Sequence, residues 1–172
     1  MNNLSSKIVC AARHPKTSPS RLKKLSKHRS TTIRLYVASN FNCPASALER
    51  LSTDSYRLIV LNVAGHKNTS AKTLQKLASQ NDIAIRFEVA RNRSALFSIL
   101  EKLSKDSSKL VRQTAFKNKN NYRLQKLLNF DIIKCFKYKY GKSNGQNRLP
   151  QIFYHTMFKN WEHMYFKIIQ EI

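Results

Sequence analysis

The residues with the clearest chemical potential in this sequence are cations that recur at a fixed spacing. Each lies between two leucines, 26 residues from the previous one, except that the last step is 24 residues. Duplex DNA carries about one negative charge per 1.7 Å of axis, so a regular line of cations meets several phosphates at once. Such contacts supply affinity without base specificity. The spacing therefore predicts a surface for nucleic acid or another polyanion, formed by Lys24, Arg50, Lys76, Lys102 and Lys126.

Two less complete rows of cations keep the same period. One consists of Arg34, Arg86 and Arg112, with Val60 in the gap, and the other of Arg13, Arg91 and Lys117. The alternative interpretation is a solvated helix face, because Lys and Arg are good helix formers and a duplication copies them. A plain solvated face normally mixes the two signs of charge, however. Residues 1–130 hold 25 Lys and Arg against six Asp and Glu, which favours an anionic partner, either nucleic acid or an acidic protein. The alternative function is a protein-interaction scaffold that holds an unknown partner on its curved face.

The composition of the whole chain limits its class. The 172 residues have a formal net charge of +23, and 41% of them are hydrophobic. That apolar content suffices for a core and differs from the composition of a disordered chain. A charge this positive attracts nucleic acid, an anionic membrane face or an acidic protein. The alternative is that the source proteome is basic in general, which would give the same excess of Lys and Arg without a binding role.

The sequence predicts no enzyme and no cofactor. Three distant cysteines show no metal-ligand spacing and favour a reducing, cytoplasmic compartment. There is no paired nucleophile and base and no phosphate-binding loop, and no apolar stretch is long enough for a signal peptide or a membrane span. His14 and His66 are too far apart, at two periods, to share a metal. A base-excision enzyme would need a carboxylate in a basic groove, and the few candidates are Glu49, Glu88 and Glu101.

These cations must be positioned by a repeated structural unit. When the sequence is shifted by 26 residues, the same residue types return in several columns, which is the signature of a repeat protein. One unit cannot bury its apolar face, whereas stacked units can. We therefore predict an all-α fold, an α-solenoid of about five helix-pair repeats. The main columns are Ala11, Val37, Val63, Val89 and Ala115; Ala12, Ala38, Ala64, Ala90 and Phe116; His14, Asn40, His66, Asn92 and Asn118; Ile33, Ile59, Ile85 and Val111; Leu22, Leu48, Leu74 and Leu100; and Leu25, Leu51, Leu77 and Leu103.

Each unit is expected to contain two short helices. Residues 32–39 have the i, i+4 apolar spacing of a first helix, and residues 19–26 and 44–52 begin with prolines suited to a first turn. Asp54, Asp82 and Asp106 precede first helices as capping acceptors. The Asn/His column falls where the first helix ends, and we expect left-handed backbone there. In the fifth unit the loop is two residues shorter, so its leucines are Leu124 and Leu127.

The segments IRLYVASNFNCPASALERLSTD (residues 33–54) and IRFEVARN (residues 85–92) resemble the leucine-rich repeat variant (LRV) family, whose pattern is similar to VRxxVAxNPNTPxxxLxxLAxD. The resemblance covers about residues 7–128, and HEAT-like repeats are close neighbours. It implies a right-handed superhelix of alternating α-helices and short 3₁₀-helices, without a catalytic motif. Some members bind an iron–sulfur centre through an N-terminal cysteine cluster. Only Cys10 lies near this N-terminus, so that cofactor is not expected. HEAT-like DNA glycosylases are more distantly similar.

The repeat register ends near residue 130, which predicts a repeat domain over residues 1–130 and an extension over residues 131–172. The extension contains a basic, aromatic stretch and then an amphipathic helical pattern from Pro150 to Ile172. A capping helix is the simplest interpretation, because the end of a repeat stack needs cover. The alternatives are a dimerisation or partner helix, an interfacial helix on an anionic membrane, and stacking of its aromatic residues on bases. The oligomeric state stays open.

Overall fold

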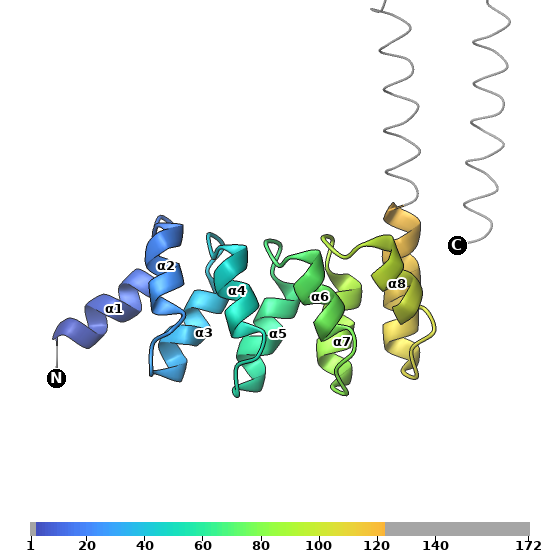
Figure 1. The fold of residues 1–172 in the computed structure, drawn as a ribbon, viewed down its shortest axis with the longest axis horizontal. Helices are drawn as coiled ribbons and strands as arrows, with labels where there is room; N and C mark the ends of the chain where they lie inside the picture. Colours follow the sequence, from blue (N-terminus) through green and yellow to red (C-terminus); the bar gives the residue numbers. More distant parts are fainter. Residues whose placement is uncertain (1–2, 123–172) are drawn as a thin grey trace, which may run out of the picture. The chain divides into compact units, whose positions relative to one another are not determined.

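The computed structural model describes residues 3–122, and side chains from residue 6 onward. The chain divides into two units, Met1–Asn129 and Phe130–Ile172, and all the described residues belong to the first. Within residues 3–122 the regular structure is entirely helical, which confirms the predicted all-α class (Figure 1). None of the described helices has the length and apolar character needed to cross a membrane. The labelled helices are α1 (Asn3–Arg13), α2 (Pro19–Leu25), α3 (Thr31–Ser39), α4 (Ala45–Leu51), α5 (Arg57–Gly65), α6 (Ala71–Leu77), α7 (Ile83–Arg91) and α8 (Phe97–Leu103).

The helix boundaries repeat with the period of the sequence. The second helices α2, α4, α6 and α8 begin at residues 19, 45, 71 and 97, and all have seven residues. The first helices α3, α5 and α7 begin at residues 31, 57 and 83, and all have nine. The second helices are α-helical, so the 3₁₀-helices that the LRV resemblance implies do not occur among the described residues.

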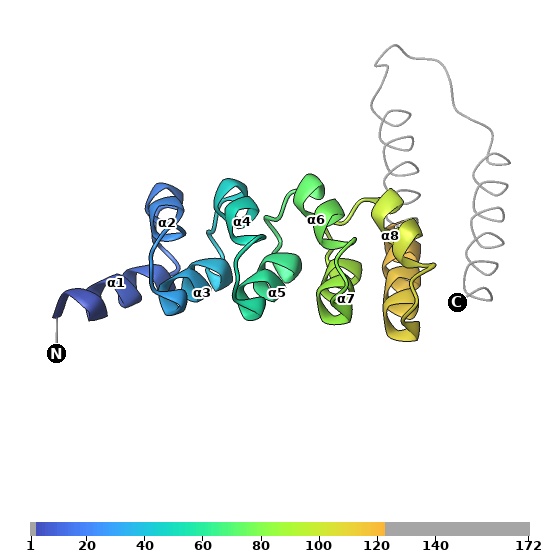
Figure 2. The same ribbon diagram turned by 60° about the horizontal axis from the view of Figure 1, so that its bottom comes forward.

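The helices form two layers (Figure 2). In one layer the first helices pack directly on one another, α1 on α3, α3 on α5 and α5 on α7. Each second helix of the other layer packs on the first helix that follows it, as α2 does on α3 and α4 on α5. The core between the layers contains the predicted apolar columns as far as they are described. Among their members, Ala11 and Leu25 at the N-terminal end are partly accessible, and Phe116 at the other end is exposed.

The Asn/His column links successive helix pairs rather than ending helices in a left-handed turn. Asn40, His66 and Asn92 follow their helices with extended backbone, near φ −73°, −75° and −69°, so the expectation of left-handed caps was wrong. Asn40 Nδ2 donates to the His14 carbonyl at 3.0 Å, and Asn92 Nδ2 donates to the His66 carbonyl at 3.1 Å. His66 Nε2 lies 3.0 Å from the Asn40 carbonyl, and Asn118 Nδ2 donates to the Asn92 carbonyl at 3.0 Å. We call this chain of contacts the Asn/His ladder.

The fifth unit departs from the pattern. A helical segment runs through residues 109–122, past the position where earlier units turn into a loop. Asn118 therefore lies inside a helix, although its side chain still bonds to the preceding unit through Ala90 and Asn92. The expected second helix of this unit, with Leu124, Lys126 and Leu127, lies outside the described residues, as does the extension over residues 131–172.

Candidate polyanion-binding surface

Four cations of the main column lie near the ends of the four second helices. Lys24, Arg50, Lys76 and Lys102 each occupy the next-to-last position of α2, α4, α6 and α8, and each side chain is exposed. The leucines on either side of each cation force this exposure, because both leucine positions face the core; they are buried except for the partly accessible Leu25. We call these four residues the cation row. The fifth member predicted from the sequence, Lys126, is outside the described residues.

The cation row follows the layer of second helices. Those helices succeed one another along the molecule in chain order (Figure 1). The four members therefore project from four successive helices of this layer. Lys102 Nζ donates to Ser79 Oγ at 2.8 Å, which shows that a cation of one pair reaches the loop of the preceding pair.

The second predicted row, Arg34, Arg86 and Arg112, has a structural role in this protein. The Arg34 guanidinium makes a bidentate ion pair with Asp54, at 2.6 and 3.1 Å, and Arg86 makes the same pair with Asp106, at 2.7 and 3.0 Å. Both pairs are largely buried, with side-chain exposures of 17% and 7% for the first and 11% and 7% for the second. Arg112 donates to the carbonyls of Asp106 and Ser107. These arginines hold the loops between helix pairs, so they are not available as a phosphate track.

In the described part of the chain, the few carboxylates pair with cations outside the cation row. Asp54, Asp82 and Asp106 pair with Arg34, Arg57 and Arg86. Glu88 pairs with Arg91, and Glu101 approaches Lys119 at 3.8 Å. Within residues 6–122, no member of the cation row has a carboxylate partner. The acidic residues therefore serve the fold and leave the row uncompensated.

The third predicted row does not form one surface. Arg91 pairs with Glu88 at 2.9 Å, and the Arg13 guanidinium stacks over the Tyr36 ring at 5.2 Å. Lys117 is exposed on the helical segment of the fifth unit. The three members thus have three different environments.

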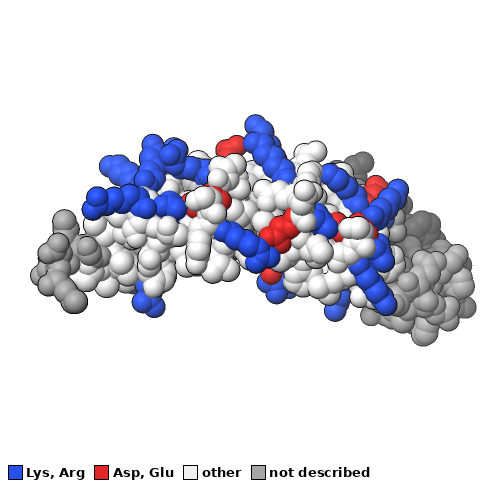
Figure 3. Space-filling model, turned by 90° about the horizontal axis from the view of Figure 1, so that it is seen from below, with Lys and Arg blue, Asp and Glu red and all other residues white. Residues whose placement is uncertain are grey.

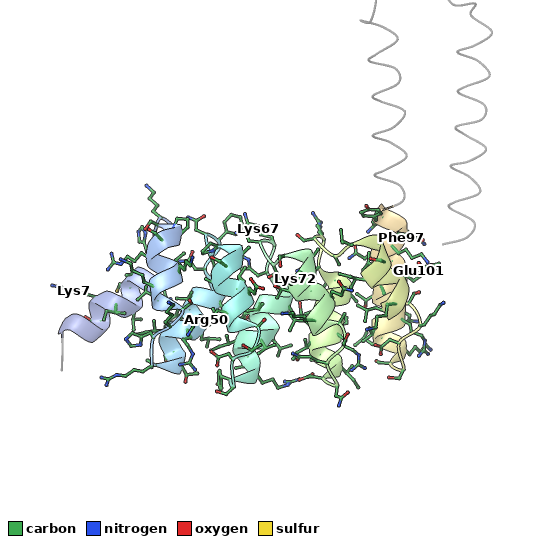
Figure 4. The ribbon with its side chains drawn as sticks, in the orientation of Figure 1. Lys7, Arg50, Lys67, Lys72, Phe97 and Glu101 are labelled. Carbon is green, nitrogen blue, oxygen red and sulfur yellow. The ribbon has the colours of Figure 1, made fainter. Side chains whose placement is uncertain are left out.

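A groove lies where the ends of α2 and α4 approach the loop before α3. Its volume is about 720 Å³, and we call it the basic groove. Arg50 of the cation row lines it, on the side of α4 turned toward α2 and α3 (Figure 4). Viewed from below, a dense group of Lys and Arg side chains lies toward the N-terminal end of the described residues (Figure 3). The lining residues are Ser26, Lys27, His28, Arg29, Arg34, Ser46, Glu49, Arg50, Leu51, Thr53 and Asp54.

Sequence reasoning did not find this groove. Lys27 and Arg29 form no continuous column, because Thr53 and Ser55 replace them one unit later and a cation returns only at Lys105, three units after Lys27. The available signal was local: residues 21–29 contain Arg21, Lys23, Lys24, Lys27 and Arg29 and no acid.

The three glutamates considered for base excision occupy different places. Glu88 and Glu101 contact cations, as described above, whereas Glu49 lines the basic groove. Among the described residues, no group of three or more His, Cys, Asp or Glu side chains is arranged to hold a metal ion.

Burial raises the pKa of the Cys43 thiol to about 12. The Arg34 guanidinium holds the pKa of Asp54 below its usual value, mainly by hydrogen bonding, and Arg86 does the same for Asp106. These carboxylates therefore stay charged at neutral pH and belong to ion pairs, so the structure offers them no acid–base role.

Comparisons with protein families, with curated proteins and with solved structures found no match to this chain.

Proposed function

We propose that this protein is a non-enzymatic binder of nucleic acid that holds the phosphate backbone along the cation row. The observation that carries the proposal is that the same position of every described second helix holds an exposed cation without a carboxylate partner, namely Lys24, Arg50, Lys76 and Lys102. A row of this kind contacts several phosphates and no base edges, so binding is largely independent of sequence.

The distribution of carboxylates supports this proposal over a simple solvated face. A solvated face would pair its cations with nearby acids. Here Asp54 and Asp106 are used in buried pairs with arginines that hold the loops. The four residues of the cation row have no carboxylate partner in the described region, and a polyanion supplies the missing charge.

The test is duplex DNA binding measured by fluorescence anisotropy over a series of salt concentrations. Each phosphate contact that is lost should reduce the slope of log K against log salt by about 0.9. Replacing all four residues of the row by Gln should therefore lower the slope by roughly 3 to 4 and weaken binding at low salt.

The control has the same change of charge outside the cation row, in the loops that lead into α2, α6 and α8 and on the helical segment of the fifth unit. Lys16, Lys67, Arg93 and Lys117 are exposed and are also replaced by Gln. Figure 4 shows Lys67 beyond the end of α4 opposite to Arg50. This variant should keep most of the wild-type slope. Equal losses in both variants would show that only net charge matters and would reject the assigned surface.

We further propose that the helix pairs form a right-handed α-solenoid of the LRV or HEAT-like kind. The support is the 26-residue repeat of the helix boundaries and the packing of each first helix on the next.

An acidic protein is the alternative ligand of the cation row. Titration with duplex DNA distinguishes the two ligands. If the row binds an acidic protein instead, this chain should show no tight, salt-dependent binding of DNA.

A further inference from the structure

The basic groove differs from the rest of the cation row in both charge and shape. Arg50 belongs to the row, and Lys27 and Arg29 add two cations from the loop between α2 and α3. At the next two junctions Thr53 and Ser79 replace Lys27, and Ser55 and Asn81 replace Arg29. At the fourth junction Lys105 keeps the position of Lys27, but Ser107 replaces Arg29, so only the first of the described junctions has a cation at both positions.

The charges in the groove leave a net excess of two positive charges. Arg34 and Asp54 neutralise each other in their bidentate pair. Lys27, Arg29 and Arg50 remain, and Glu49 opposes them with one negative charge. No carboxylate lies within ion-pair distance of these three cations in the part of the chain that the structure describes.

The wall of the groove is held in place before any ligand binds. Arg34 Nη1 donates to the carbonyls of His28 and Arg29, both at 3.0 Å. The Ser30 amide donates to His28 Nδ1 at 3.0 Å, so the neutral ring carries its proton on Nε2 and can donate there. Preorganised donors bind an anion with less loss of conformational entropy than mobile ones.

We propose that the basic groove binds a terminal phosphate monoester of the nucleic acid strand that lies along the cation row. A terminal phosphate carries about −1.5 to −2 at neutral pH, whereas an internal phosphodiester carries one charge, so the excess of two matches the terminal group. The volume of about 720 Å³ is within the size range of small-ligand sites and accommodates a nucleotide. This inference rests on the proposed function and adds an anchor at one end of the row.

The experiment compares one short DNA duplex in three forms: with 5′-phosphates, with 3′-phosphates and without terminal phosphates. Charge-assisted hydrogen bonds to two or three cations should make the phosphorylated form that fits bind about tenfold more tightly. The two phosphorylated forms identify which strand end enters. Fluorescence anisotropy at fixed salt measures all three affinities with the full-length protein.

Variants of the groove locate the effect. Replacing Lys27 and Arg29 by Gln should abolish the preference for the phosphorylated form and leave most of the binding of the unphosphorylated duplex. Replacing Lys105 and Lys109, exposed residues of the fourth junction, by Gln is the charge-matched control and should preserve the preference. Glu49→Gln removes the opposing charge and should increase it severalfold.

Equal affinity for the three duplexes would overturn the anchor, and so would a Lys27/Arg29 variant that weakens all three by the same factor. Either result leaves salt-dependent binding along the cation row intact. Absence of binding to every duplex would instead reject the proposed function itself.

Discussion

His66 is the buried titratable residue of the Asn/His ladder. The Asn68 amide donates to its Nδ1 at 3.1 Å, so the proton is on Nε2, which donates to the Asn40 carbonyl at 3.0 Å. The neutral ring satisfies both contacts, and a second proton would break the one at Nδ1. Burial is the main cause that lowers its pKa, and the charge of Lys67 lowers it further, against the raising effect of the Asn40 carbonyl.

This environment predicts a pH-dependent stability. The pKa of His66 is lower in the folded than in the unfolded protein, where it is near 6.5, so folding favours the neutral ring. The stability that the neutral His66 ring contributes is present above the pKa of the unfolded protein and is lost as the pH falls through that pKa. Chemical unfolding of the wild type and of His66→Asn, measured between neutral pH and pH 5, should show a steeper loss for the wild type. Asn is a suitable replacement because it occupies the same ladder position at residues 40 and 92. Parallel pH profiles of the two proteins would contradict this account.

The loops between helix pairs depend on buried ion pairs. Asp106 accepts both hydrogen bonds from Arg86 and also accepts from the Ser108 amide at 2.8 Å. The pair between Arg57 and Asp82 is more exposed, with side-chain exposures of 58% and 25%. Removing one partner of a buried charged pair leaves the other without compensation, whereas an exposed pair contributes little.

The two aspartates therefore provide a matched comparison. Asp106→Asn keeps an acceptor for the Ser108 amide but leaves Arg86 unpaired, and should lower the free energy of unfolding by about 1–3 kcal/mol. Asp82→Asn keeps the cap on the Ala84 amide and should cost less than about 1 kcal/mol. Urea unfolding of both variants at neutral pH measures the difference. A larger loss for Asp82→Asn would refute the structural role assigned to the Arg86–Asp106 pair.

At this scale the sequence predicted the helices better than the contacts between them. The apolar columns located the helices to within about two residues, and Asp82 caps α7 as expected. The Arg34 and Arg86 contacts were missed because their partners lie 20 residues away in another element. A signal was present: aspartate stands 20 residues after both arginines, and where Val60 replaces the arginine, Gln80 replaces the aspartate.

Over the whole molecule, the repeat converts a local preference into a long surface. A cation between two core-facing leucines is unremarkable in one helix. A fixed period of 26 residues, however, places such a cation at the same position of every described second helix. The period was readable from the sequence because each column must satisfy the same packing in every unit. The groove at the first junction was not readable in this way, because Lys27 and Arg29 break the repeat. Periodicity thus predicts the shared features of a repeat protein and misses those that make one unit different.

The same helical position leaves all four members of the cation row exposed. Each comes from a different helix and should contact a separate phosphate, so their contributions to binding should be similar and nearly additive. The most direct measurement is the salt dependence of duplex binding for the four single substitutions Lys24→Gln, Arg50→Gln, Lys76→Gln and Lys102→Gln. Each should lower the slope of log K against log salt by about 0.9, while Lys16→Gln and Arg93→Gln leave the slope unchanged. Four row variants with the wild-type slope, or control variants that lower it as much as the row variants do, would contradict the assignment of this surface.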